Sequence, residues 1–464
     1  MSTDPVGARH PAAREFARRL LGATLALALT GGVLAVVVTL QGPKLERVVV
    51  DPARAVVLAG QRLTLQMNQE VVAIDADSLE VEPAAAAEAS IVDGVVSVRF
   101  ERPLAAGTEY LVRLGEVRGA AQPASAAVET RFTTPAETAY VLERRTGRDD
   151  AVVAADAAGR RDVLTAPRIQ EFARTAEITV AVVLGDDDRT SLAIAGDRDE
   201  ANATLAVPDG TIRQLRGSAT NPVFGYVLSS TAPDGSRTHT LSTVDVSGVA
   251  PGSPRPALGP GGEPLTVVDW AFVPGTASLV AQDETQSLFL VDTLGVAPVA
   301  PLGVHAELRG FVPGTQTLVV ADPDGGSTID LAGGATAPLR LANPDAPGAH
   351  PGVLALLDYA GDYVISLMTE DERGVIAARG LARVDADGAT RLLFAPAAPG
   401  GFISGFCLAP NGLSVAVETV GASGTRDGYP NAPGFTESTT TVVDVRDGTV
   451  RFNASGAASS WCAG

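Results

Sequence analysis

The hydrophobic positions of the chain form one long apolar run followed by many short ones. Residues 20–40 are 21 consecutive uncharged, mostly apolar positions. As a helix this run is roughly 30 Å long, the thickness of the hydrocarbon core of a bilayer. The rest of the chain consists of short apolar runs separated by Gly, Pro, Asp or Asn, which is typical of β-strands and turns. The pattern predicts one helix followed by an all-β chain.

The long apolar run is predicted to be a membrane anchor. A cleaved signal peptide is the alternative, but its apolar region is usually about 7–15 residues long and ends at a small-x-small cleavage site. The run here is longer, and Val38-Thr39-Leu40-Gln41 offers no such site. Four basic residues precede the run and two follow it, namely Arg9, Arg14, Arg18, Arg19, Lys44 and Arg47. By the positive-inside rule, residues 1–19 are a cytoplasmic tail, residues 20–40 cross the cell membrane once, and the bulk of the chain is extracytoplasmic.

Residues 45–135 alternate apolar and polar positions in short segments with glycine turns between them, which predicts a β-sandwich. The stretch 103–114, with the closing segment 131–135, resembles the SbsA-like bacterial Ig domain. Within it, Gly107 is expected to make a turn, Thr108 to bond the turn backbone, and Tyr110 to begin an inward-facing strand. The resemblance implies a spacer or adhesion module rather than a catalyst.

An aromatic residue recurs at intervals of 39 to 55 residues through the rest of the chain. The series is Phe172, Phe224, Phe272, Phe311, Tyr359, Phe406 and Trp461. Each lies in or beside an apolar run that leads to a turn and another apolar run, which is typical of the blades of a β-propeller. The pattern aromatic-x-x-Pro-Asp/Asn-Gly resembles TolB-like and WD-repeat-like propellers, so residues 139–464 are expected to form a propeller of about seven blades.

The two ends of the repeat region are expected to meet. Residues 140–142 and 151–153 have the pattern of second and third strands of a blade, whereas residues 454–464 supply only a first strand. The C-terminal strand is therefore predicted to complete the first blade, because blades bury their apolar faces only against neighbours. Cys407 and Cys462 are candidates for a disulfide across this closure, and two separately buried thiols are the alternative.

Composition and motifs exclude several classes of function. The 54 acidic and 35 basic residues give a net charge of −19, which argues against nucleic-acid binding. The four histidines form no zinc motif, and the sequence has no nucleophile elbow, P-loop or Rossmann glycine pattern. We therefore expect no catalytic, cofactor-binding or metal-ligating residues. Asp186–Asp188 and Asp322-Pro-Asp324 contain calcium-ligating residue types but are interpreted as hairpin turns.

The longest polar interruption, residues 421–438, lies between two predicted strands of the last blade. Long loops on rigid scaffolds are common binding sites, and Arg426, Tyr429 and Phe435 are its candidate contact residues. A surface loop without a partner is the alternative.

Together these features predict a membrane-anchored, non-catalytic cell-envelope protein. It would present a propeller on an Ig-like stalk and bind or scaffold an envelope protein, peptide or glycan. The alternative is a propeller-type hydrolase or lyase with a metal held in the central channel, since a site built from several blades leaves no local motif. A structural component that self-associates is a third hypothesis.

Overall fold

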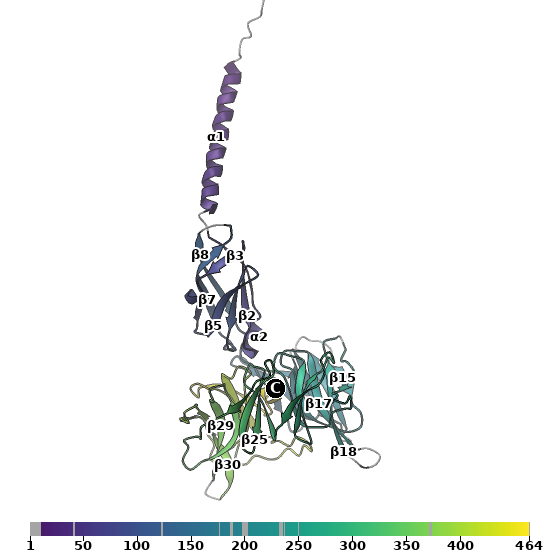
Figure 1. Ribbon diagram of the computed structural model, residues 1–464. Helices are drawn as coiled ribbons and strands as arrows, with labels where there is room; N and C mark the ends of the chain where they lie inside the picture. The colour runs from purple at the N-terminus through teal and green to yellow at the C-terminus, as the bar shows by residue number, and fades with distance from the viewer. Residues whose placement is uncertain are drawn as a thin grey trace, which may run out of the picture. The chain divides into compact units, whose positions relative to one another are not determined.

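The protein is nearly all β, with one long N-terminal helix (Figure 1). The computed structural model describes residues 11–39, 42–121, 124–175, 177–185, 189–196, 203–231, 235, 237–248, 250–370 and 374–463. Contacts divide the chain into two units. The first comprises Met1–Asp51, Gln61–Glu101 and Glu109–Thr133, and the second comprises Pro52–Gly60, Arg102–Thr108 and Thr134–Gly464.

Helix α1 (Pro11–Thr39) contains the predicted anchor. Its segment Glu15–Val33 is long and apolar enough to cross a membrane, by length and composition. Residues 1–10 of the predicted cytoplasmic tail and Leu40, the last residue of the predicted span, lie outside the described residues.

Two antiparallel sheets make up the rest of the first unit, one in the order β1-β2-β6-β5 and the other in the order β3-β7-β4, with β8 also paired to β7. Their strands are β1 (Leu45–Val49), β2 (Arg62–Met67), β3 (Val71–Ile74), β4 (Glu80–Glu82), β5 (Ala87–Val92), β6 (Val95–Phe100), β7 (Glu109–Gly119) and β8 (Ser125–Thr133), with the 3-10 turn η1 (Ala76–Ser78). The ring of Phe132 lies 5.6 Å from that of Tyr110 and 5.9 Å from that of Phe100. Because Phe100 belongs to one sheet and the other two residues to the second, the buried faces of the sheets meet in this aromatic cluster.

The predicted turn before β7 is confirmed. Gly107 has φ +62°, a conformation that favours glycine, and its N–H donates to the carbonyl oxygen of Pro135 at 2.6 Å. The hydroxyl of Thr108 donates to the carbonyl oxygen of Ala106 at 3.1 Å. Tyr110 is buried, so the strand does begin on its inward-facing side.

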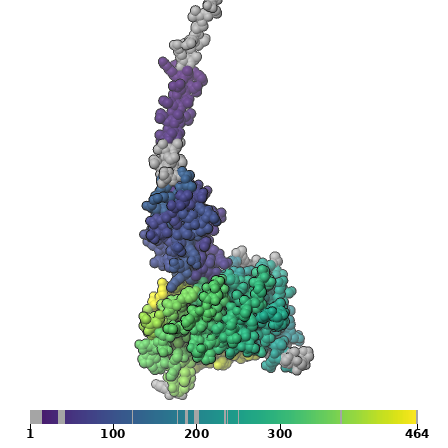
Figure 2. Space-filling view, in the orientation of Figure 1, coloured from purple at the N-terminus to yellow at the C-terminus, as the bar shows by residue number. Residues whose placement is uncertain are grey.

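The second unit is a β-propeller, as predicted. In the described part of residues 139–463, seven antiparallel sheets follow one another, the first with three strands and the others with four. Among the described residues of this unit, every strand pairs with its sequence neighbour and no strand is exchanged between sheets, which is the connectivity of propeller blades (Figure 1). Figure 2 shows the surface of this unit, coloured from teal through green to yellow along the chain. The strands are β9 (Ala139–Glu143), β10 (Asp150–Asp156), β11 (Gly159–Ala166); β12 (Ile169–Thr175), β13 (Ile178–Leu184), β14 (Thr190–Gly196), β15 (Ala203–Ala206); β16 (Thr211–Gly217), β17 (Val223–Thr231), β18 (Arg237–Asp245), β19 (Arg255–Pro256); β20 (Val267–Phe272), β21 (Ser278–Asp283), β22 (Ser287–Asp292), β23 (Ala300–Val304); β24 (Glu307–Phe311), β25 (Thr317–Asp322), β26 (Gly325–Asp330), β27 (Thr336–Leu339); β28 (His350–Leu356), β29 (Tyr363–Glu370), β30 (Ile376–Val384), β31 (Thr390–Phe394); β32 (Phe402–Leu408), β33 (Ser414–Val420), β34 (Ser438–Asp444) and β35 (Val450–Ser455).

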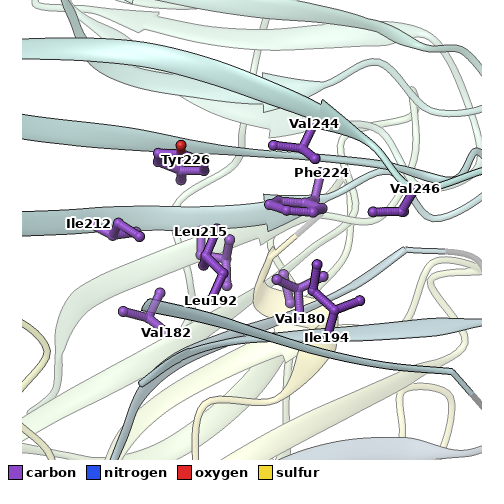
Figure 3. Close-up of a cluster of buried hydrophobic side chains, with 11 residues drawn as sticks. Val180, Val182, Leu192, Ile194, Ile212, Leu215, Phe224, Tyr226, Val244 and Val246 are labelled. Carbon is purple, nitrogen blue, oxygen red and sulfur yellow. The ribbon is translucent and has the colours of Figure 1, made fainter. Parts of the chain in front are cut away.

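The propeller core lies between neighbouring sheets. One cluster joins Val180, Val182 and Leu192 of one sheet to Phe224 and Tyr226 of the next (Figure 3). The second strand of a sheet is covered on both faces, so strands such as β13 and β33 are buried along almost their whole length rather than at alternate positions. Each sheet is therefore stabilised mainly by its two neighbours, which makes closure of the ring important.

The seven residues of the aromatic series do not occupy equivalent positions in the propeller. Four members lie on first strands, β12, β20, β24 and β32. Phe224 instead lies on the second strand β17, Tyr359 lies in the turn between β28 and β29, and Trp461 lies in the 3-10 turn η2 (Ser460–Ala463). In the sheet of Phe224, the first strand carries the buried Leu215, so an aliphatic residue fills the core there.

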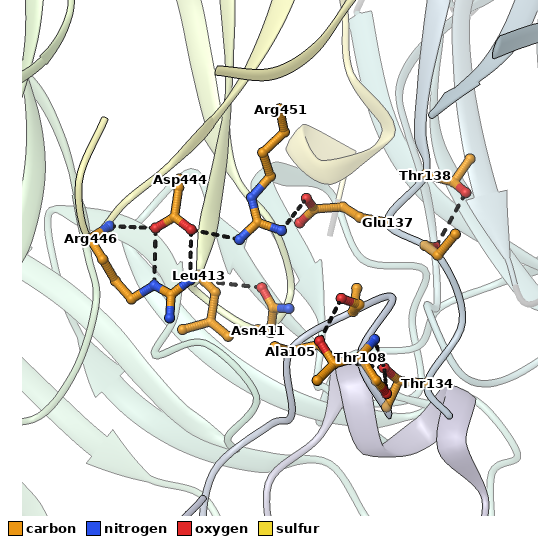
Figure 4. Close-up of polar contacts among 12 residues, drawn as sticks. Ala105, Thr108, Thr134, Glu137, Thr138, Asn411, Leu413, Asp444, Arg446 and Arg451 are labelled. Atoms are coloured by element: carbon orange, nitrogen blue, oxygen red, sulfur yellow. Dashed lines mark hydrogen bonds and ion pairs between the residues drawn. The ribbon is translucent and has the colours of Figure 1, made fainter. Parts of the chain in front are cut away.

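The C-terminal residues reach the first sheet through a single bridge. Leu142 of β9 and Ala457 exchange both backbone hydrogen bonds, at 2.8 and 3.0 Å. Beyond this bridge the chain turns into η2, so the described C-terminal residues add one bridge rather than a full strand. A second link joins the last sheet to the start of the first: the guanidinium of Arg451 donates to Glu137 at 3.1 Å and to Asp444 at 2.6 Å (Figure 4).

Two short segments that precede the propeller in sequence pack on one of its ends. Helix α2 (Pro52–Val57) and the loop 102–108 belong to the propeller unit. The N–H of Ala59 donates to the carbonyl oxygen of Gly314 at 2.9 Å, and Asn411 Nδ2 donates to that of Leu104 at 3.4 Å. Gly314 and Asn411 lie in turns between first and second strands, so these turns form the end of the propeller that α2 covers (Figures 1 and 4).

Candidate functional site in the propeller channel

A cavity of about 1230 Å³ is lined by residues from five of the seven sheets. Strands β12, β16, β28 and β32, each the first of its sheet, contribute to it, together with the end of β9 and residues 457–459. First strands of different sheets come together only around the axis of a propeller, so the cavity lies in the central channel. The cavity is large enough for a small molecule or a peptide side chain, and four aromatic residues contribute to its wall, Phe172, Phe402, Phe406 and Phe435.

The cavity opens at the end of the propeller opposite α2. Most of its lining residues come from the beginnings of the first strands β12, β28 and β32, from the hairpin between β29 and β30, and from the loop between β33 and β34. In a four-stranded meander these parts lie at the opposite end from the turns between first and second strands, where α2 packs. In Figure 1 the hairpin between β29 and β30 points away from α2, in agreement with this topology.

A shift in register, caused by extra residues in the strand, occurs in the first strand of each of the six four-stranded propeller sheets. These bulges lie between Ile169 and Glu171, Arg213 and Arg216, Val267 and Asp269, Leu308 and Phe311, Pro351 and Leu354, and Ile403 and Gly405. A bulge re-aims the extra residue relative to the strand's alternation. Gln170, Val353 and Ser404 are bulge residues that line the cavity, so this backbone feature gives the channel some of its side chains.

The predicted binding loop forms one wall of the cavity. Arg426 and Phe435 line it, and they lie opposite each other in an antiparallel bridge with the guanidinium 4.9 Å from the ring centre. The ring of Phe435 also contacts that of Phe402 edge-on at 5.6 Å. Tyr429, the third candidate, does not line the cavity. Its hydroxyl donates to the carboxylate of Asp150 in the first sheet.

Beside Tyr429, the loop is held to the first two sheets by Arg144. The guanidinium pairs with the carboxylate of Asp427, donates to the carbonyl oxygens of Gln170 at 2.7 Å and Ala432 at 2.9 Å, and lies 3.9 Å from the ring centre of Tyr429. Burial raises the pKa of Asp427, but the N–H of Gly434 and the Arg144 guanidinium outweigh it and hold that pKa below its usual value. For Tyr429, burial and the Asp150 carboxylate raise the pKa. The loop is therefore a ring-closing element as well as a cavity wall.

Two carboxyl groups line the cavity, that of the half-buried Glu171 and that of the buried Glu418, and sequence reasoning did not find either. Glu171 on β12 accepts the N–H of Leu215 at 2.9 Å, which links two neighbouring sheets. Glu418 on β33 accepts the N–H of Ser459 at 3.0 Å. Burial raises the pKa of both. Perturbed acids in a cavity are candidates for functional groups. Each is the only acidic residue of its strand and belongs to no local motif, so the sequence carries no signal for them.

The remaining candidates from the sequence are the two cysteines and the two groups of aspartates. Cys407 lies on β32, which contacts η2, the element that contains Cys462. That contact is compatible with a disulfide, and the pairing stays a prediction because the side chain of Cys462 is outside the described part. Asp322 pairs with Nδ1 of His305 at 2.8 Å, and Asp186–Asp188 lie outside the described residues. No group of three or more His, Cys, Asp or Glu in the described residues is arranged to hold a metal ion.

Comparisons with known proteins return structures only. No protein-family model matches the sequence. No curated protein matches it either. Similar solved structures include dihydro-heme d1 dehydrogenase NirN in complex with DHE (14% identity, 69% of this chain and 74% of that chain, TM-score 0.40). TolB from Agrobacterium tumefaciens (10%, 69% and 90%, 0.32) and apo AztD from Citrobacter koseri (11%, 76% and 94%, 0.32) are also similar. Similarities this distant carry no functional argument, and the propeller assignment rests on the sheet order.

Proposed function

We propose that this chain is a membrane-anchored cell-envelope protein that presents a seven-bladed propeller on an Ig-like stalk and binds a partner in the channel of the propeller. The role is binding or scaffolding rather than catalysis. The observation that carries the proposal is the cavity in the channel, whose wall includes four phenylalanine residues and, from the long loop, Arg426 as well as Phe435. The partner is an envelope protein, peptide or glycan.

The strand order of the first unit supports the Ig-like stalk. In chain order the strands become A (β1), B (β2), C (β3 with β4), D (β5), E (β6), F (β7) and G (β8). The sheets are then A-B-E-D and C-F-G, with β3 and β4 each pairing with β7. This is the strand order of constant-type Ig domains.

The N-terminal helix supports the anchor. Residues 20–40 enter the lipid bilayer in this proposal, with the N-terminus in the cytoplasm because basic residues are more numerous before the apolar run than after it. The six four-stranded sheets and the three-stranded first sheet, completed by the bridge at Ala457, are the seven blades.

A photocrosslinking experiment in the producing cells tests the binding role. A photoreactive phenylalanine analogue replaces Phe435 in the cavity wall or, as the control, Tyr359, which is 61% exposed in a turn at the α2-covered end. We expect a specific adduct with an envelope component from position 435 and none from position 359. Adducts of equal yield at both positions, or none at 435, would contradict binding in the channel.

The second candidate function is a hydrolase or lyase that uses the channel. The carboxyl groups of Glu171 and Glu418, both in the cavity wall and both with a raised pKa, are the observation that favours it. Elemental analysis of the purified full-length protein separates the two functions, because a stoichiometric metal retained in the channel would favour the enzyme.

A further inference from the structure

Glu418 is placed so that its carboxyl group reaches the channel from the second strand of the last sheet. It lies opposite Gly405 in the β32–β33 register. A Cβ added to Gly405 would stand 3.3 Å from Glu418 Oε2, so glycine at this position leaves the carboxyl group room above the inner strand. Glu418 is only 9% exposed, and it lines the cavity.

The other charged groups of the cavity lie near an opposite charge or an aromatic ring, whereas no basic group of the described residues acts on Glu418. Glu171 forms no ion pair within the described residues, but the charges of Arg216, Arg144 and Arg213 act to lower its pKa. Arg144 pairs with Asp427, and Arg216 pairs with Asp269 at 2.9 Å. Arg426 lies over the ring of Phe435. Within the described residues Glu418 forms no ion pair, and the groups that act on its pKa are its burial and the N–H groups of Ser459 and Ala458.

A buried carboxylate without a counter-ion is unfavourable unless a positive charge is brought to it. Phe402 and Phe406, on the strand paired with that of Glu418, line the same cavity, and the face of an aromatic ring attracts cations. The net charge of −19 attracts cationic ligands over a longer range. The site thus combines an apolar wall with one uncompensated negative charge.

We propose that the channel binds an organic cation, an ammonium group on an apolar stem, and that Glu418 is its counter-ion. This inference rests on the proposed binding function and specifies the ligand chemistry. Two sources share this chemistry, a free amine and the lysine side chain of a peptide.

Calorimetry on the full-length protein in detergent tests the cation directly, with probes of similar shape: 2-phenylethylammonium, 2-phenylethanol and phenylacetate. A hydrogen bond to a charged group is worth about 10- to 100-fold in affinity. We expect the ammonium probe to bind about 10- to 100-fold more tightly than the alcohol, and phenylacetate to bind most weakly. Glu418→Gln keeps an acceptor for Ser459 and should abolish the difference, whereas Glu307→Gln, a change at an exposed acid on β24, should preserve it.

A pH series on the unmodified protein gives the same test without a variant. Burial raises the pKa of Glu418, so the advantage of the ammonium probe should disappear on acidification while ordinary carboxylates, with pKa values near about 4.3, are still ionised.

A capped pentapeptide with a central lysine, compared with its norleucine counterpart, identifies the source of the ammonium group. Tighter binding of the lysine peptide indicates a peptide partner, and tighter binding of the free amine alone indicates a small molecule.

Equal affinity for the ammonium and the alcohol would overturn the cation while leaving channel binding intact. Absence of binding by every cationic probe would also overturn it, and the crosslinking experiment at Phe435 would then decide separately whether the channel has a partner.

Discussion

Replacing Arg144 by alanine is expected to open the propeller ring at its closure. The side chain of Arg144 is 10% exposed and that of Asp427 is 2% exposed, so the change leaves a buried carboxylate without its partner. It also removes the hydrogen bonds to Gln170 and Ala432 and the cation–π contact with Tyr429. Breaking a buried ion pair by removing one partner costs about 3–5 kcal/mol.

Intrinsic tryptophan fluorescence during urea unfolding measures this loss in the propeller alone. The only two tryptophans of the sequence, Trp270 and Trp461, both belong to the propeller unit. Arg309→Ala is the matched control, because Arg309 and its partner Glu307 are 35% and 59% exposed and such pairs contribute at most about 1 kcal/mol. We expect the urea midpoint to fall several times further for Arg144→Ala than for the control.

The double variant Arg144→Met/Asp427→Asn separates the ion pair from the rest of the loss. Because it removes both charges, it should be more stable than the sum of its single variants predicts. If Arg144→Ala lowers the unfolding free energy no more than Arg309→Ala does, the closing role of the loop is refuted.

Three further outcomes are expected. Burial raises the pKa of Glu418, so its contribution to stability is fully present below the unfolded pKa and is lost as pH rises through the folded one; Glu418→Gln should therefore raise the melting temperature at pH 8 and change it little at pH 4. Gly314→Ala should destabilise the propeller by more than about 1 kcal/mol, because φ is +71° and the new methyl group would meet a proline side chain at 2.2 Å, whereas Gly334→Ala, with φ +73° and open space, should cost only the backbone strain; equal urea midpoints would contradict the packing of that turn. Titration of the unreduced, denatured chain should find no free thiol, and Cys407→Ser should cost about 2–4 kcal/mol if Cys407 and Cys462 are paired, whereas two reactive thiols would refute the disulfide.

The repeat architecture was predictable from sequence because it depends on local signals. Turns such as Phe272-Val-Pro-Gly-Thr and the apolar second strands form from local sequence alone. Their recurrence therefore indicates the successive sheets of the propeller. Phe224 shows the limit of this reasoning: the spacing of the aromatic residues persists although its side chain lies on a second strand, because the core between sheets accepts an aromatic or an aliphatic residue at several positions.

The site was predictable only in part. Arg426 and Phe435 belong to a loop whose length and composition are visible in the sequence, and both line the cavity. The binding of Arg144 to Asp427 is not visible, because it joins residues 283 positions apart. Glu418 likewise acquires its significance only when Gly405 and Ser459 are placed beside it.

Each bulge in a first strand contains a residue that is not needed for strand pairing or for the alternation of core side chains. Pairing resumes on both sides of each bulge, so the residue within it is exempt from the in-and-out alternation that the core imposes on the rest of the strand. One bulge residue from each of six strands forms the set Gln170, Gln214, Val268, Gly310, Val353 and Ser404. Gln170, Val353 and Ser404 of this set line the cavity, so substitutions there can alter the channel while the frame stays constant. These inner-strand bulges are therefore a natural place to diversify, by evolution or in a combinatorial library, what this propeller recognises.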